Sequence, residues 1–83
     1  MKGLYQNDRW GPDPVKLYGL IKRGNMVKAL IKHPGGSWDT SDSFYKTAKY
    51  VGPLHESVLL QETPYWSWEW VDKTVLHRLP RYL

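Results

Sequence analysis

The segment from Tyr65 to Val71, which reads Tyr-Trp-Ser-Trp-Glu-Trp-Val, constrains the fold of this chain more than any other feature. Its three tryptophans, Trp66, Trp68 and Trp70, recur at every second residue. Successive side chains of an extended strand point to opposite faces, so the three indoles would share one face of a strand, whereas helical spacing would spread them around the axis. The pattern therefore predicts a β-strand with one face of large aromatic rings.

Other segments show strand-like patterns between turn signals. Apolar side chains alternate over residues 15–21 and 26–33, and Arg23-Gly24-Asn25 between them is typical of a tight hairpin turn. His33-Pro34-Gly35-Gly36 predicts a type II turn, and the polar residues 37–43 predict an exposed loop. The remaining predicted strands are 44–51, which ends at Gly52-Pro53, and 57–63, which ends at Pro64.

Short strands at this spacing predict a single all-β domain, a small barrel of five or six strands of the SH3-like or OB-like kind. We expect residues 1–14 to form an irregular arm, residues 15–79 the barrel body and residues 80–83 a tail. The pattern leaves open whether residues 74–79 form a strand or a helical turn. Because the chain has no cysteine, its compactness must come from apolar burial, for which it supplies five Trp, six Tyr and one Phe.

The tryptophan face has two interpretations, and the sequence does not decide which face of residues 65–71 is buried. The preferred one is a wall of the core with Trp68 at its centre, because a chain of 83 residues has few other large apolar groups. The alternative is an exposed aromatic platform that stacks bases or anchors a protein interface. A mixed arrangement would bury the central ring and expose an end ring.

Charge is distributed unevenly along the chain. Residues 16–49 carry six lysines and one arginine against two aspartates, whereas residues 50–72 carry four acidic residues and no Lys or Arg. Such a two-signed pattern fits a protein partner or self-association as well as it fits nucleic acid. The chain shows no secretory signal and no apolar stretch of membrane-spanning length, so we expect a complete small cytoplasmic protein without membrane contact.

The second face of the predicted hairpin combines lysines with apolar side chains. Leu20, Met26 and Leu30 would lie there, so we expect the N-terminal arm or a partner to cover part of this face. We predict a non-enzymatic binding protein that docks on a larger protein or ribonucleoprotein complex and inhibits or adapts it, in analogy with phage- and plasmid-encoded accessory proteins. The predicted partner-binding residues are Tyr18, Lys22, Arg23, Lys28, Leu30, Lys32, Trp66 and Trp70.

The alternative function is RNA or DNA binding by the same small barrel. Lysines interleaved with aromatic rings on a sheet can follow a phosphate backbone and stack bases. The residues predicted to do so are Lys16, Tyr18, Lys22, Arg23, Lys28, Lys32, Tyr45, Lys46 and Lys49. The sequence leaves self-association into a homo-oligomer open.

One short motif resembles a haem-binding sequence. His33-Pro34-Gly35-Gly36 is similar to the haem-ligand motif of cytochrome b5-like domains, in which His55 would be the second ligand. That family has acidic helices between its ligands, whereas this chain has the basic segment 45–50, so we prefer the turn interpretation. The histidines show no close metal-ligand spacing, and no nucleophile or phosphate-loop motif is present. We therefore expect no catalytic residue, no metal site and no cofactor.

Overall fold

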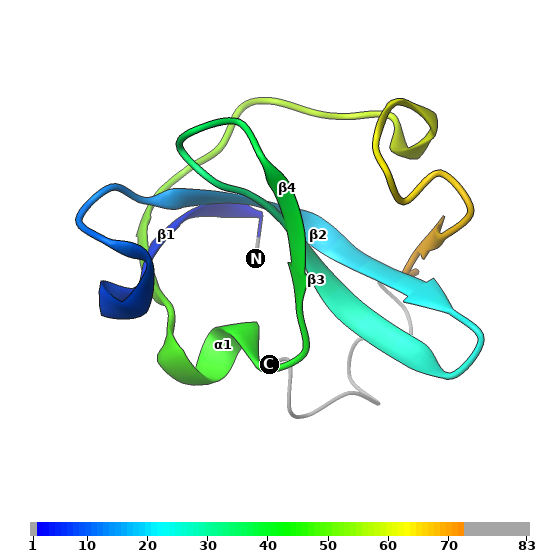
Figure 1. Cartoon of the computed structure of the whole chain (residues 1–83), viewed down its shortest axis with the longest axis horizontal. Coiled ribbons are helices and arrows are strands. Elements are labelled where there is room, and N and C mark those ends of the chain that lie inside the picture. Colours follow the sequence, from blue (N-terminus) through cyan, green and yellow to red (C-terminus); the bar gives the residue numbers. More distant parts are fainter. Residues whose placement is uncertain (1, 73–83) are drawn as a thin grey trace.

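The computed structural model describes residues 2–72, apart from the side chain of Tyr45. They form one antiparallel sheet of six strands in the order β4-β3-β2-β1-β5, with β6 also paired to β2 (Figure 1). The predicted all-β class is confirmed. The strands are β1 (Gly3–Gln6), β2 (Val15–Arg23), β3 (Met26–Lys32), β4 (Trp38–Ser41), β5 (Lys49–Gly52) and β6 (Glu69–Trp70). The other described elements are one helical turn, α1 (Phe44–Thr47), and two 3₁₀ turns, η1 (Asp8–Trp10) and η2 (Leu60–Glu62).

Strand β2 is the centre of the sheet because it is long enough to pair with three neighbours. β3 runs along one edge of β2, and the two strands meet at the two-residue turn Gly24-Asn25. Gly24 has φ 60°, and glycine with positive φ at the first central position is typical of a type II′ turn. The predicted hairpin is therefore confirmed. Along the other edge, β1 pairs with residues 15–17 of β2 and β6 with residues 21–22.

A bulge in β2 changes the direction in which its later side chains point. The register with β3 shifts between Leu17 and Gly19, where Gly19 has φ 151°. One extra residue reverses the alternation beyond a bulge. As a result, Leu20 lies opposite Ala29 on the face that carries Leu17, and Ile21 lies on the other face. The strict alternation predicted for this strand is therefore wrong beyond the bulge.

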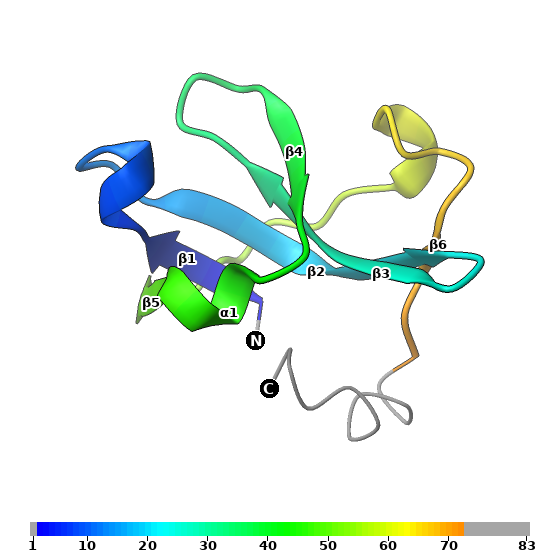
Figure 2. The same cartoon turned by 60° about the horizontal axis from the view of Figure 1, so that its bottom comes forward.

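The first face of the sheet carries the larger of two apolar clusters. Phe44 of α1 is fully buried there, and its ring centroid lies 5.0 Å from that of Tyr5 and 5.8 Å from that of Trp10. Figure 2 shows α1 beside β1 and β5. The buried members of the cluster are Tyr5, Val15, Leu17, Leu20, Ala29, Ile31 and Phe44.

The second face of the sheet is covered by the part of the chain that follows β5. Ile21 and Leu30 are fully buried on this face, and they form a cluster with Leu60 of η2. The partly buried side chains around them are Tyr18, Trp38, Val58, Tyr65 and Trp68. Figure 1 shows this segment passing over the sheet to η2. The expected cover by the N-terminal arm or a partner is corrected for Leu30, which residues 58–68 cover. Leu20 lies instead in the first cluster, together with Tyr5.

Closure of the sheet into a barrel is not confirmed. Within residues 2–72, β4 and β5 are the two ends of an open strand order, and no ladder joins them. The chain passes directly from β4 through α1 to β5, and α1 lies between these edges in Figure 1. A helical turn with one buried ring therefore stands between the strands that a barrel would pair.

The N-terminal residues 1–14 were expected to be an irregular arm, and this prediction is wrong. Residues 3–6 form β1 between β2 and β5, and residues 8–10 form η1. The side-chain oxygen of Asn7 caps η1 by accepting a hydrogen bond from the Arg9 amide at 2.9 Å. Gly3 is required in β1, since a Cβ there would lie 2.6 Å from the ring of Tyr50. Glycine, proline and asparagine residues scattered through this segment led to the prediction of an irregular arm, although it contains a short strand.

Three more predicted segments differ from the structure. The expected loop 37–43 contains β4, the expected strand 44–51 contains α1 before β5, and the expected strand 57–63 contains η2. In the last case, the Thr63 hydroxyl donates to the Leu60 carbonyl at 2.9 Å and accepts from the Tyr65 amide at 3.0 Å. Such local side-chain bonds favour a turn over a strand.

The predicted turn at residues 33–36 is confirmed, because the Gly36 amide donates to the His33 carbonyl at 2.8 Å. Its predicted type is wrong, since a type II turn requires positive φ at Gly35, whereas the positive φ of 98° falls at Gly36. The undecided segment 74–79 and the predicted tail 80–83 lie outside the described residues.

In the described part of the chain, no helix has the length and apolar character needed to cross a membrane.

Candidate functional site

The predicted strand 65–71 is a turn followed by two strand residues. Residues 64–67 turn, the Trp68 amide donates to the Tyr65 carbonyl at 3.0 Å, and only Glu69 and Trp70 belong to β6. Consequently the three tryptophans do not form one continuous face. Trp68 packs into the second cluster with its ring 6.0 Å from that of Tyr65, whereas Trp66 is 69% exposed.

Trp70 lies over the bulge of β2. It pairs with Ile21, so both side chains lie on the second face of the sheet. A Cβ at Gly19 would be 3.1 Å from Cζ3 of Trp70, which means that the missing side chain of Gly19 makes room for the indole. Trp70 remains 41% exposed and borders a pocket of about 230 Å³ that is also lined by Lys2, Tyr18, Ser57 and Val58.

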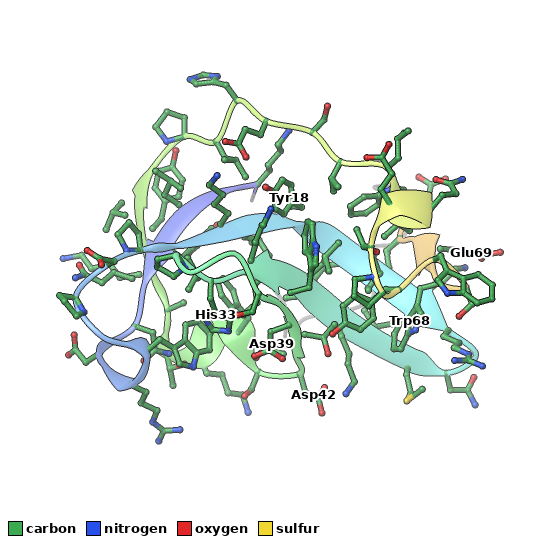
Figure 3. All side chains as sticks on the ribbon, turned by 45° about the horizontal axis from the view of Figure 1, so that its top comes forward. Tyr18, His33, Asp39, Asp42, Trp68 and Glu69 are labelled. Atoms are coloured by element: carbon green, nitrogen blue, oxygen red, sulfur yellow. The ribbon has the colours of Figure 1, made fainter. Side chains whose placement is uncertain are left out.

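The predicted lysine and tyrosine face is largely occupied by the chain itself. The carboxylate of Glu56 accepts hydrogen bonds from Lys16 Nζ at 2.8 and 3.0 Å and from the Tyr18 hydroxyl at 2.9 Å. These bonds, from Lys16 first and Tyr18 second, lower the pKa of Glu56. Burial, followed by the bond to Glu56, raises the pKa of Tyr18 to about 12. Figure 3 shows Tyr18 on the sheet beneath this segment.

Two other lysines of this predicted face are also engaged. Lys28 Nζ lies 3.2 Å from Oδ1 of Asp42, and Lys32 Nζ lies 4.9 Å from the ring centroid of Trp38. Leu30 is fully buried, so its predicted partner contact is wrong. Lys16 and Tyr18 therefore contact the chain just before the covering residues 58–68, and Lys28 and Lys32 contact β4 and the residue that follows it.

Lys46 in α1 and Lys49 in β5 are exposed, but the fold does not bring them to the hairpin turn. β5 pairs with β1, which pairs with the beginning of β2, whereas Lys22 and Arg23 end that strand. The side chain of Tyr45 lies outside the described structure. The predicted nucleic-acid residues are therefore split between two ends of the sheet.

The hairpin turn and β6 together form the largest concentration of predicted site residues that stay exposed. A pocket of about 240 Å³ is lined by Lys22, Arg23 and Gly24 from the hairpin and by Ser67 and Glu69 from the other segment. Figure 3 shows Glu69 and Trp68 at this end of the molecule. We define the tip surface as the lining of this pocket together with three exposed apolar side chains: Met26, which pairs with Arg23, and Trp66 and Trp70, which are adjacent in sequence to Ser67 and Glu69. Its residues are Lys22, Arg23, Gly24, Met26, Trp66, Ser67, Glu69 and Trp70.

The tip surface contains residues that the sequence patterns did not select. Met26, opposite Arg23, is 49% exposed, although it was expected on a covered face. Ser67 and Glu69 reach the pocket because β6 pairs antiparallel with β2, which places Glu69 opposite Lys22. No local signal marks this pairing, because it joins residues far apart in the sequence.

A second polar group lies at the opposite end of β3. His33 Nε2 lies 3.0 Å from Oδ2 of Asp39 (Figure 3). The centroid of the His33 ring lies 5.6 Å from that of Trp10. A pocket of about 430 Å³ beside His33 is lined by Asp13, Lys16 and Lys32 among others. Within residues 2–72, no group of three His, Cys, Asp or Glu side chains is arranged to hold a metal ion.

Comparison of the chain with known proteins found no match to a family model, a curated protein or a solved structure.

Proposed function

We propose that this chain is a non-enzymatic binding module that docks on a larger protein through the tip surface. The observation that carries the proposal is the exposure of Trp66, which is 69% exposed and directly precedes Ser67 of a pocket lined by two cationic side chains. Tryptophan and arginine are the side chains most enriched among residues that dominate the energy of protein interfaces. Trp66 directly precedes Ser67, which lines the same pocket as Arg23, so its exposed indole is best explained as an interface anchor.

The state of the two sheet faces supports this location. Both faces are already covered, the first by Phe44 and its neighbours and the second by Leu60 and the residues around it. A partner has little to gain from displacing either cluster, whereas Met26, Trp66 and Trp70 offer apolar area without rearrangement. Interfaces commonly form with little backbone movement.

Nucleic-acid binding is the competing proposal, and the same tip surface would support it. Lys22 and Arg23 could contact phosphates while Trp66 or Trp70 stacks a base at about 1–3 kcal/mol. The proposal loses support from Lys16 and Lys28, because each of them already has a carboxylate partner. The two proposals differ in their response to salt, since phosphate contacts weaken steeply as salt rises.

The test compares affinity capture from a lysate by the wild-type protein, by Trp66→Ser and by Val51→Ser. Val51 is a matched control, because it is 47% exposed but lies on β5. We expect proteins captured by the wild type to be lost with Trp66→Ser and kept with Val51→Ser. Equal capture by all three proteins would reject the tip surface.

A companion measurement uses single- and double-stranded oligonucleotides at about 50 and 200 mM salt. The protein-docking proposal expects no tight binding at either concentration. Tight binding that falls by orders of magnitude at the higher concentration would favour nucleic acid instead.

A further inference from the structure

Within residues 2–72, Lys22 and Arg23 have no acidic partner, unlike Lys16 and Lys28 of the same hairpin. Lys16 is paired with Glu56 and Lys28 with Asp42. Within residues 2–72, by contrast, no carboxylate oxygen lies within 4.0 Å of Lys22 Nζ or the Arg23 guanidinium. Both side chains are exposed and line the same pocket.

Glu69, the acidic residue paired with Lys22 across the two strands, does not neutralise this pocket. Glu69 stands directly opposite Lys22 in the β2–β6 pair, yet the two side chains form no ion pair. The pocket lining thus contains two full positive charges and one negative charge, together with the hydroxyl of Ser67. Such a lining favours an anionic group from outside the described chain.

We propose, resting on the docking function above, that the partner presents an acidic peptide segment to the tip surface. One of its carboxylates enters the pocket between Lys22, Arg23 and Ser67, and a neighbouring apolar side chain packs against Trp66 or Trp70. A guanidinium binds a carboxylate through two parallel hydrogen bonds, which fixes the orientation of the segment. Complementary charge sets the partner preference, and the indoles supply apolar area.

The acidic side chain of the pocket itself argues for an isolated carboxylate rather than a continuous polyanion. Glu69 lines the pocket and pairs with Lys22 across the two strands. A phosphate backbone that crossed the pocket would pass this carboxylate, and like charges repel. One acidic side chain between apolar neighbours avoids that repulsion.

The pairing of β2 with β6 determines which side chains a bound segment would contact on each side of the sheet. Adjacent residues of β6 point to opposite sides of the sheet, so Glu69 shares a side with Lys22 while Trp70 shares the other with Ile21. By the same alternation Arg23 shares the side of Trp70, so a segment that crosses β6 at the pocket would meet Lys22 from one side and Arg23 with Trp70 from the other. This arrangement predicts an acidic residue and an apolar residue close together in the partner.

The test uses the full-length, ¹⁵N-labelled protein and two short synthetic peptides, one alternating Glu with Leu and the other alternating Lys with Leu. We expect the Glu/Leu peptide to shift the Gly24 amide and the Trp66 and Trp70 indole signals. Its affinity should exceed that of the Lys/Leu peptide by about tenfold, which corresponds to about 1.4 kcal/mol.

A pair of double variants locates the charge effect. Lys22→Gln with Arg23→Gln should weaken Glu/Leu binding about tenfold, whereas Lys46→Gln with Lys49→Gln, which removes the same charge elsewhere, should leave it unchanged. All four side chains are exposed, so both variants should fold. Equal affinity for the two peptides, or equal binding by the two double variants, would overturn the acidic-partner inference.

The same variants distinguish failure of the acidic-partner inference from failure of the proposed docking function. If Trp66→Ser abolishes capture of protein partners but Lys22→Gln with Arg23→Gln does not weaken it, docking at the tip surface stands and the acidic segment is rejected. A short single-stranded oligonucleotide that bound more tightly than the Glu/Leu peptide would also overturn the inference, because it would show that a polyanion is tolerated.

Discussion

Replacing Phe44 with alanine should remove a large part of the stability of this fold. Phe44 is fully buried and contacts the rings of Tyr5 and Trp10. Burial of a phenylalanine side chain contributes about 1.5–3 kcal/mol by transfer from water, and the cavity left behind raises the total loss to about 3–5 kcal/mol. At roughly 0.05–0.15 kcal/mol per residue, an 83-residue chain has about 4–12 kcal/mol in total.

Urea unfolding followed by far-ultraviolet circular dichroism measures this loss. Trp66→Ala is the matched aromatic control, and its exposed side chain should change the free energy of unfolding by no more than about 0.5 kcal/mol. Phe44→Leu, which keeps part of the ring volume, should lose less than Phe44→Ala and provides a folded variant if the alanine protein unfolds. A loss below about 1 kcal/mol for Phe44→Ala would refute the position assigned to the core.

Three other perturbations test local features of the second face. Gly19→Ala should cost about 1–3 kcal/mol, because φ is 151° and the new Cβ would lie 3.1 Å from Trp70; an unchanged urea midpoint would contradict the bulge. The free energy of unfolding should fall as pH rises from about 10 to 12, because an unfolded tyrosine ionises near pH 10 whereas folded Tyr18 keeps its proton to about pH 12. The absorbance of the phenolate measures this ionisation. The folded state lowers the pKa of Glu56, so the bonds of its carboxylate should stabilise the fold above about pH 4.3. This stabilisation should be lost as pH falls through the folded pKa, and Glu56→Gln should remove that part of the acid dependence.

Local patterns were sufficient to predict the hairpin but not which of its side chains lie on each face of the sheet. Alternation on both sides of Gly24-Asn25 predicted the β2–β3 pair, which the structure confirms. The bulge at Gly19 was not predicted, although a glycine within an alternating run often marks a bulge or a close contact. Its position depends on Trp70, which belongs to a distant segment and packs where a side chain would stand.

The aromatic segment shows why periodicity misleads in a short run. Alternate tryptophans predicted a strand over residues 65–71, yet the hydroxyl of Thr63 and the residues from Pro64 onward form a turn. Two hydrogen bonds and the proline outweigh a pattern of only seven residues. Strand geometry resumes at Glu69, where β2 offers an unpaired edge.

The candidate site could be predicted in part. The exposed pair Lys22 and Arg23 and the indoles of Trp66 and Trp70 were selected from the sequence, and the fold places them at one end of the molecule. The role of Glu56 could not be predicted, because it contacts Tyr18 and Lys16, which precede it by 38 and 40 residues. Leu30 was assigned to the partner surface because it shares the lysine face with Leu20 and Met26, whereas the structure buries it with Leu60.

The most direct test of the docking account is the footprint of a captured protein partner on the ¹⁵N-labelled chain. The account predicts that the signals of Gly24 and of the Trp66 and Trp70 indoles shift or broaden when the partner is added, while those of Tyr50 and Val51 on β5 do not change. A footprint centred on β5, with the tip surface unaffected, would contradict it.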